Sequence, residues 1–152
     1  MMNQVCCFDI DGTLADIEHR RHFVTQKPKR WDLFFKGIPD DTPRDTVVQM
    51  LKNFHAAGYR IVLCSGRSED QRKDTVAWLF DVAGVGPLVS NLYMRASKDN
   101  RPDELVKAEL YDQMIVDGFD DVVCVVDDRP KVIRMWRARG LFVIDVGDGV
   151  EF

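Results

Sequence analysis

Short, wholly apolar segments alternate with amphipathic helical patterns along most of this chain of 152 residues. The segments expected as strands are 4–8, 60–64, 88–94, 121–126 and 141–146, and the helices are expected over 42–58, from 68–71 onward, over 102–118 and over 130–140. Strands that are apolar throughout have to be covered on both faces, which is typical of a parallel sheet. The alternation therefore predicts an α/β fold: a Rossmann-like parallel sheet with helices on both faces, in a single domain over 1–152.

Capping signals set the expected limits of the helices. Thr42 is expected as the N-cap of the helix over 42–58, with Pro43 at its first helical position and Gly58 at its end. The sequence SEDQ at 68–71 is a capping box that opens the next helix, for which we expect the inward positions Val76, Leu79 and Phe80.

Composition narrows the possible environment of the protein. The chain is 45% apolar and 30% charged, and its formal net charge is −4. No apolar run reaches the length of a membrane span and no signal peptide is visible, so we expect no membrane association and a cytoplasmic location. The net charge argues against a protein that coats nucleic acid by bulk electrostatics, but it leaves room for a local basic groove.

The four cysteines fall inside expected strands, and no CxxC spacing of a metal site is present. They are Cys6, Cys7, Cys64 and Cys124. We interpret them as small hydrophobic residues of the core.

The alternation is interrupted by residues 15–41, which are long for a strand-to-helix connection and are expected to form a small cap-like insertion over the site. Within them, HRRHFVTQKPKR at 19–30 contains five Lys or Arg residues and no acidic one. This stretch fits a solvated loop and a clamp for nucleic-acid phosphates about equally well. In the second interpretation the substrate contacts include Arg20, Arg21 and Arg30, and Trp31 or Phe23 stacks on a base.

Polar residues follow the expected strands where those strands end. Asp9 and Asp11 come after the first strand, Ser65-Gly66-Arg67 after the second, and Asp127-Asp128 after the strand at 121–126. Lys107 lies early in the helix that precedes this last strand. Because binding sites of parallel α/β sheets lie at the carboxyl ends of the strands, these side chains are expected to meet there.

Four carboxylates cannot share a small pocket without compensating positive charge. The simplest compensation is a hard divalent cation, and Mg²⁺ needs only one or two carboxylates besides waters and a substrate phosphate. The candidate metal ligands are Asp9, Asp11, Asp127 and Asp128.

The spacing of the first two aspartates suggests phosphoryl transfer. Asp9 and Asp11 project to the same side of an extended chain, so one can attack phosphorus while the other exchanges protons with the leaving oxygen and with water. Gly12 allows a sharp turn and Thr13 supplies a hydroxyl, which is expected to bind substrate. The Ser65 hydroxyl and neighbouring amides, including that of Gly66, can cradle the phosphoryl oxygens, which Lys107 neutralises.

The motifs DIDGT at 9–13, CSGR at 64–67, a helix lysine and VVDDR at 125–129, in this order, resemble the haloacid dehalogenase superfamily of phosphatases. Within it, SGR, PDELVK at 102–107 and DDRPKVIRMWRARG at 127–140 look like the 3′-phosphatase domain of bacteriophage polynucleotide kinase.

The resemblance implies a role for each matched residue. Asp9 is then the nucleophile and Asp11 the acid/base, while Ser65, Arg67 and Lys107 bind the scissile phosphate. Asp103 supports Lys107, and Asp127 and Asp128 serve Mg²⁺ directly or through water. The implied substrate is the 3′-phosphate of a DNA or RNA end; the alternative is a free nucleotide or another small phosphorylated metabolite, which the motifs fit equally well.

Two further possibilities bear on function. No GxxxxGK[ST] motif occurs in the chain, so we expect no 5′-kinase activity. A non-catalytic module, such as a phospho-accepting receiver, is disfavoured because receivers place the acidic pair at the first strand and the accepting aspartate at the third, whereas here DIDGT comes first and the DD pair late.

Overall fold

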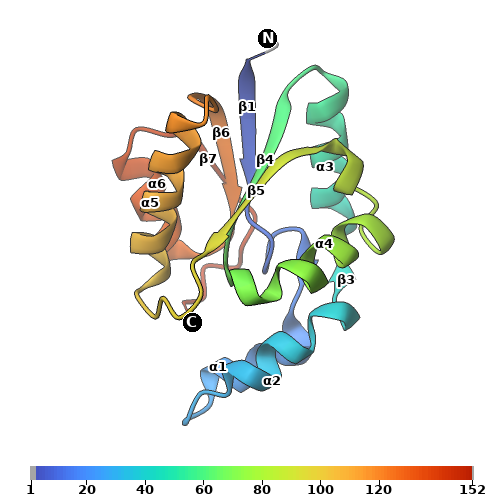
Figure 1. Cartoon of the computed structure of the whole chain (residues 1–152), viewed down its shortest axis with the longest axis vertical. Coiled ribbons are helices and arrows are strands. Elements are labelled where there is room, and N and C mark those ends of the chain that lie inside the picture. The colour runs from blue at the N-terminus through green and yellow to red at the C-terminus, as the bar shows by residue number, and fades with distance from the viewer. Residues whose placement is uncertain (1–2, 152) are drawn as a thin grey trace.

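A five-stranded parallel sheet forms the centre of the computed structural model, which describes residues 3–151 (Figure 1). The strand order is β5-β4-β1-β6-β7, and every pair of neighbours is parallel. The strands are β1 (Gln4–Phe8), β4 (Arg60–Ser68), β5 (Val89–Arg95), β6 (Asp121–Asp127) and β7 (Val143–Asp145). The predicted α/β class and parallel sheet are therefore confirmed.

Two pairs of helices cover the two faces of the sheet (Figure 1). α3 (Asp45–Ala56) and α4 (Arg72–Asp81) pack on one face, and α5 (Asp103–Val116) and α6 (Pro130–Ala138) on the other. Alternate residues of β1 point to opposite faces: Cys6 and Phe8 join the first core cluster, whereas Val5 and Cys7 join the second. This double coverage explains why the central strands are apolar throughout.

Residues 15–41, which we call the cap, lie at the carboxyl end of the sheet, in the lower part of Figure 1. They contain β2 (Ala15–Asp16), α1 (Glu18–Thr25), α2 (Trp31–Lys36) and the 3₁₀ turn η1 (Ile38–Asp40). β2 pairs antiparallel with β3 (Thr42–Pro43), so the chain leaves and re-enters the main body at adjacent points. Two more 3₁₀ turns, η2 (Glu69–Gln71) and η3 (Gly86–Leu88), complete the structure.

Two details of the expected helices are wrong. Thr42 and Pro43 form β3, and α3 begins only at Asp45, because pairing with β2 holds the two residues extended. Phe80 is 52% exposed, whereas Leu79 is buried. The ring of Phe80 packs against Gly86, where a Cβ would lie 2.3 Å from its Cδ2 atom.

The four cysteines are free and buried, as predicted for core residues. Cys6 and Cys124 come closest across β1 and β6, with a distance of 3.7 Å between their sulfur atoms. Among the helices of residues 3–151, none combines the length and the apolar character needed to cross a bilayer.

Candidate active site

The carboxyl ends of β1, β4 and β6 open into a cavity of about 70 Å³ between the sheet and the cap. Its walls include Asp9, Asp11, Ser65, Lys107 and Asp128. Sequence segments that are far apart thus meet at one edge of the sheet, where the parallel topology predicts a binding site.

A buried lysine joins two strands at the floor of this cavity. Lys107 Nζ lies 2.8 Å from Asp9 Oδ1 and 3.1 Å from Asp127 Oδ2, and all three side chains are almost inaccessible to solvent. Burial alone lowers the pKa of Lys107, but the charges of Asp127 and Asp9 outweigh it and raise this pKa above its ordinary value. The ammonium group is therefore a permanent positive charge beside Asp9.

Asp9, Asp127 and Asp128 bring carboxylate oxygens within 4.8 Å of one another. Burial raises the pKa of Asp9 well above its usual range; Lys107 opposes this effect, while Asp127 and Asp128 add to it. Burial and the charge of Asp127 raise the pKa of Asp128 to about 6. In the protein alone, these three carboxylates are therefore short of positive charge.

The hydrogen bonds of Asp127 distinguish it from Asp128. Its Oδ1 accepts the backbone N–H of Asp128 at 2.8 Å, and its Oδ2 accepts bonds from Lys107 and from Trp136 Nε1 at 3.0 Å. Asp128 accepts a side-chain bond from Thr13, at 3.3 Å, through Oδ1. Both carboxylate oxygens of Asp127 thus accept bonds from protein donors. The carboxylate of Asp128 lines the cavity and can accept further bonds there.

The donor set fits a hard divalent cation. Three buried carboxylates face one buried ammonium, which leaves two negative charges to be balanced. Oxygen ligands in this number suit Mg²⁺, which retains several waters of its own. Asp11, expected among the metal ligands, lies outside this group because its carboxylate is turned toward two arginines.

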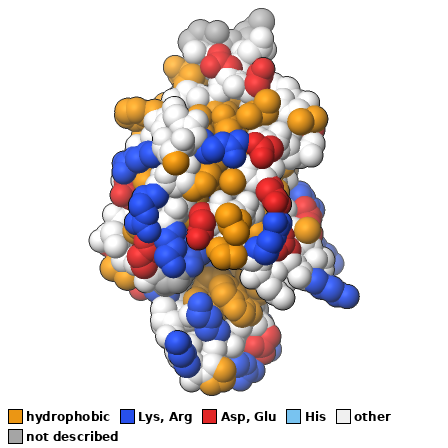
Figure 2. Space-filling view, turned by 90° about the vertical axis from the view of Figure 1, so that its left-hand side faces the viewer, with side chains coloured by type: hydrophobic (Ala, Val, Ile, Leu, Met, Phe, Trp, Pro, Cys, Tyr) orange, Lys and Arg blue, Asp and Glu red, His pale blue; other side chains and the backbone are white. Residues whose placement is uncertain are grey.

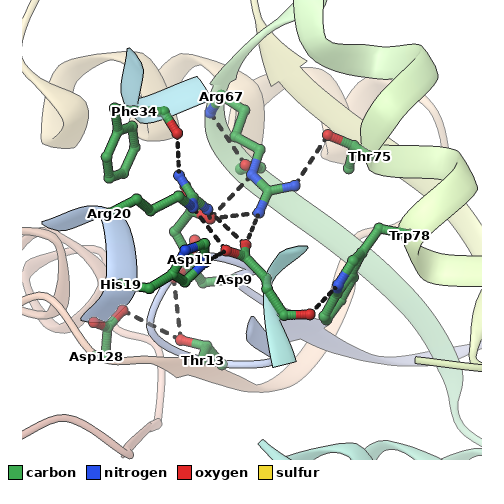
Figure 3. A network of polar contacts seen from close by, with 12 residues as sticks. Asp9, Asp11, Thr13, His19, Arg20, Phe34, Arg67, Thr75, Trp78 and Asp128 are labelled. Carbon is green, nitrogen blue, oxygen red and sulfur yellow. Dashed lines mark hydrogen bonds and ion pairs between the residues drawn. The ribbon is translucent and has the colours of Figure 1, made fainter. Parts of the chain in front are cut away.

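These two arginines, which come from different elements, contact the carboxylate of Asp11 (Figure 3). Arg20 Nη2, from α1, lies 2.7 Å from Asp11 Oδ1, and Arg67 Nε, from β4, lies 3.0 Å from the same atom. Burial would raise the pKa of Asp11, but the charges of Arg67 and Arg20 outweigh it and lower this pKa to about 2. In this arrangement Asp11 is ionised at neutral pH.

The predicted substrate contact of Arg20 needs correction, whereas that of Arg67 stays a prediction. Arg20 is completely buried, since Asp41 accepts bonds from its Nε and Nη2, both at 2.7 Å. Arg67 is equally buried, and it also donates to Thr75 Oγ1 at 3.1 Å. Both guanidinium groups set the position of Asp11. Arg67 also lines the catalytic cavity, so its contact with a phosphate stays a prediction.

Asp41, at the end of the cap, is a site residue that the sequence analysis missed. Besides Arg20, its carboxylate contacts His19 Nε2 at 2.7 Å and Arg67 Nη2 at 3.3 Å, and its carbonyl accepts Trp78 Nε1 at 2.9 Å (Figure 3). No motif surrounds it in the sequence, and only its position beside Arg20 in space shows what it does.

The rest of the basic stretch does not form one continuous path. Arg21 lies 3.0 Å from Glu18 and 4.0 Å from Asp148, and Arg30 pairs with Asp32 at 2.9 Å on the surface. The expected clamp of Arg20, Arg21 and Arg30 is therefore wrong as a single surface, because each guanidinium has found a different acidic partner.

Thr13 and Asp103 also have structural partners in place of those expected. Thr13 is buried, with its hydroxyl 3.1 Å from Asp9 Oδ2, and thus orients carboxylates. Asp103 lies between Arg95 Nη2, at 3.0 Å, and Arg129 Nη1, at 3.2 Å. Its charge still raises the pKa of Lys107, but no direct bond joins it to Lys107 in the described part of the chain.

Two glycines allow these carboxylates to approach the backbone. Gly12 has φ +80°, and a Cβ placed there would lie 2.0 Å from Asp128 Oδ2. A Cβ on Gly66 would lie 1.9 Å from Asp103 Oδ1. Any larger residue would therefore displace a charged group of the site.

Helix α2 supplies an aromatic roof over the cavity through Trp31, Phe34 and Phe35. Phe34 is buried beneath the guanidinium of Arg20, whose Cζ lies 4.2 Å from the ring centroid. Trp31 is 47% exposed. The cap thus covers the charged floor with apolar surface, and this arrangement limits the access of water.

Comparison with known proteins places this geometry in a family. Residues 3–151 match the family model described as polynucleotide kinase PNKP phosphatase domain. A protein of Autographa californica nuclear polyhedrosis virus, described as a candidate bifunctional polynucleotide kinase/RNA ligase, is 34% identical over 137 residues, which cover 85% of this chain and 17% of the viral protein.

Solved structures show the same fold. A chain of the Pnkp1/Rnl/Hen1 RNA repair complex superposes with a TM-score of 0.79 and 28% identity, over 96% of this chain and 43% of that one. The haloacid dehalogenase-like hydrolase SP0104 from Streptococcus pneumoniae shares the fold, with a TM-score of 0.66 and 12% identity over 93% and 83% of the two chains.

The present chain spans less than half the length of the viral relative and of the repair-complex chain. Its match to the family model, by contrast, extends over nearly every residue. The chain therefore belongs to the polynucleotide kinase PNKP phosphatase domain family, and it is a phosphatase of the haloacid dehalogenase type.

Proposed function

We propose that this protein is a Mg²⁺-dependent phosphomonoesterase that works through an aspartyl phosphate and removes 3′-phosphates from nucleic-acid ends. The observation that carries the proposal is the placement of Asp9: its carboxylate faces the cavity, 2.8 Å from the ammonium of Lys107. An ionised carboxylate beside a fixed positive charge is suited to attack a phosphoryl group, whose oxygens the same charge attracts.

In the first step, an Asp9 oxygen forms a bond to phosphorus and the bond from phosphorus to the 3′-oxygen breaks. The leaving oxygen takes a proton from Asp11. In the second step, water attacks the phosphorus of the aspartyl phosphate, Asp11 accepts a proton from this water, and inorganic phosphate leaves as Asp9 is restored. Lys107 and Ser65, which both line the cavity, bind the phosphoryl oxygens.

Asp11 has to change partners between these roles. Held by Arg20 and Arg67, it is ionised and ready to accept the proton of water. To donate a proton in the first step, its carboxylate has to turn from the arginines toward the leaving oxygen, where protonation is easier. Its side chain is 20% exposed, which leaves it an open side toward the cavity.

Asp9 and Asp128 are the carboxylates we assign to Mg²⁺, because both Asp127 oxygens are taken by protein donors. When bound, the ion supplies positive charge that keeps Asp9 ionised and draws electron density from the phosphoryl group.

The choice of a nucleic-acid substrate is supported by the relatives. The viral relative is described as a candidate kinase and RNA ligase, and the repair-complex chain belongs to an RNA repair assembly. RNA 3′-ends are therefore the first substrates to test, followed by DNA ends.

The test compares phosphate release from a 3′-phosphorylated oligonucleotide, a 3′-mononucleotide and a 5′-mononucleotide, with Mg²⁺ and with a chelator. We expect the highest kcat/KM for the oligonucleotide and loss of turnover with chelator. Equal or faster hydrolysis of the 5′-mononucleotide would instead favour a phosphatase of small metabolites.

Asp9→Asn separates chemistry from folding in the same assay. Turnover should fall by about three orders of magnitude or more, since the nucleophile is lost. The matched control is Asp120→Asn, a change at an exposed aspartate that precedes β6, at the opposite end of this strand from Asp127, and it should retain wild-type activity. Substantial activity of Asp9→Asn would refute the covalent mechanism.

A further inference from the structure

A second, larger cavity adjoins the candidate active site. Its volume is about 590 Å³, and it shares Trp31, Phe35 and Arg95 with the catalytic cavity. One wall is the aromatic surface of α2, and the other comes from residues 68–71 and 95–101. In the space-filling view, hydrophobic side chains gather where the narrower lower part joins the main body, with Lys and Arg side chains nearby (Figure 2).

The aromatic wall presents the half-exposed indole of Trp31, with Lys29 Nζ over its ring at 5.7 Å from the centroid. Trp31 stacks on Phe35, with ring centroids 5.9 Å apart and planes inclined by 30°, and it meets the edge of the buried Phe34 at 5.7 Å. The indole is thus braced by two rings while 47% of the residue stays exposed. Of the three tryptophans, only this one is exposed; Trp78 and Trp136 are buried.

The opposite wall is fixed to the catalytic cavity by Arg95. Its Nε donates to the carbonyl of Gly66 at 2.8 Å, and its Nη1 donates to the carbonyls of Asp99 and Arg101 at 3.1 and 2.6 Å. Ser97 Oγ adds a bond to Asp70 at 3.0 Å. These bonds fix the position of segment 95–101 relative to Gly66, which lines the catalytic cavity.

The exposed groups of this wall are polar. Gln71, Asn100 and Lys98 line the cavity together with two carboxylates that have protein partners: Asp70 accepts from Ser97 and Asp99 pairs with Arg101. Lys98 has a left-handed backbone conformation, with φ +66°. Within the described residues, Lys98 pairs with no carboxylate. A half-exposed indole opposite two residues with side-chain amides, with Lys29 and Lys98 close by, matches the chemistry of a nucleobase and its backbone phosphate.

We propose that this cavity seats the base of the 3′-terminal nucleotide whose phosphate occupies the catalytic cavity. The base stacks on Trp31, Gln71 and Asn100 face its polar edge, and Lys98 attracts the preceding phosphodiester. This inference rests on the proposed function, and it adds that the substrate is a single-stranded end, because pairing of the terminal base would occupy the polar edge that Gln71 and Asn100 face.

The decisive experiment crosses a protein variant with a substrate variant. Wild type and Trp31→Ala are compared on a 3′-phosphorylated oligonucleotide with a normal terminal base and on one with an abasic terminal residue. We expect Trp31→Ala to raise KM about tenfold or more for the normal substrate and to leave KM for the abasic substrate unchanged. Trp31→Phe should retain most of the affinity.

Two controls sharpen this comparison. Moving the abasic position to the penultimate nucleotide should restore the effect of Trp31→Ala, since the terminal base is present again. Phe142→Ala, which removes a 69% exposed ring next to β7, should behave as wild type on every substrate. Equal losses for the normal and abasic substrates would overturn the proposed base-binding site. Trp31 would then serve only to cover the catalytic cavity.

A binding measurement tests the proposed base-binding site independently of turnover. In Asp9→Asn protein, a 3′-mononucleotide should quench the fluorescence of Trp31 more than a base-free sugar 3-phosphate does. The same titration with Trp31→Phe added should lose this quenching, because the remaining tryptophans are buried. Absence of 3′-end hydrolysis by wild type would refute the proposed function, whereas equal quenching by both ligands would refute the proposed base-binding site.

Discussion

The floor of the catalytic cavity and the cap are both rich in charge, but their charges are organised by different means. On the floor, Asp9, Lys107 and Asp127 are delivered by β1, α5 and β6, and the parallel topology alone brings them together. In the cap, Arg20 and Asp41 lie 21 residues apart and meet only because β2 and β3 fold the segment back on itself. Charges at strand ends can thus be assigned from sequence, whereas charges in an insertion depend on pairing that sequence does not display.

The largest effect on stability should come from breaking the ion pairs of the cap. Asp41→Ala leaves two buried guanidinium groups short of an acceptor and should lower the free energy of unfolding by about 3–5 kcal/mol. Urea denaturation measures this change. His19→Ala removes a partner of Asp41 that is 41% exposed and should have a much smaller effect. If Asp41→Ala were as stable as wild type, the cap would not depend on this cluster.

A glycine on the floor provides a test that acts mainly on activity. Gly12→Ala should displace Asp128 and lower kcat/KM about 100-fold, since a Cβ there lies 2.0 Å from its carboxylate. Gly84→Ala is the matched control: its φ is also positive, at +71°, but no atom lies within 4 Å of the added carbon. Both variants carry a backbone penalty of about 1 kcal/mol, so a difference in activity between them reports the displacement of Asp128.

Two buried tryptophans allow the regions to be compared directly. Trp136→Phe removes a bond to the carboxylate of Asp127 and should lower stability by about 1.5–3 kcal/mol, together with kcat. Trp78→Phe removes a bond to the Asp41 carbonyl and should lower stability by about 0.5–1.5 kcal/mol, with kcat on a 3′-phosphorylated end nearly unchanged. Larger losses of stability and of kcat in Trp136→Phe than in Trp78→Phe would support the comparison. Larger losses in Trp78→Phe would contradict it.

The smallest effect is expected at the surface of the cap. Arg30→Ala breaks an exposed pair with Asp32, which water and salt screen strongly. Neither the denaturation midpoint nor kcat/KM should change measurably. A clear rise of KM for oligonucleotides, at unchanged kcat, would restore part of the basic clamp that the sequence predicted.

Most of the sheet could be predicted because hydrophobic burial on two faces leaves a plain signal. Strands β1, β4, β5, β6 and β7 all overlap apolar segments found in the sequence. The error at Thr42 and Pro43 has a physical cause: a capping pattern is local, whereas pairing with β2 depends on a strand 26 residues away in the chain. Local preferences yield to such long-range contacts.

The candidate site was predictable to the extent that its residues end strands. Asp9, Ser65 and Asp127 follow apolar runs, and the sequence places them correctly at one edge. Arg20 could not be assigned, because the five Lys and Arg residues within 19–30 look alike until their partners are known. Asp41 and Arg95 were not predicted because each acts through contacts with segments distant in the sequence.

The short ribbon of β2 and β3 has a consequence for how this protein can vary. Because the chain departs and returns through two adjacent residue pairs, Ala15–Pro43 and Asp16–Thr42, the span between the anchors of the cap stays constant whatever lies within it. Doubling the length of a flexible loop adds only about 0.6 kcal/mol of closure entropy. Insertions of very different size can therefore be accommodated at this junction without moving the catalytic strands, so that substrate range can diverge as long as Arg20 and Asp41 remain to hold Asp11.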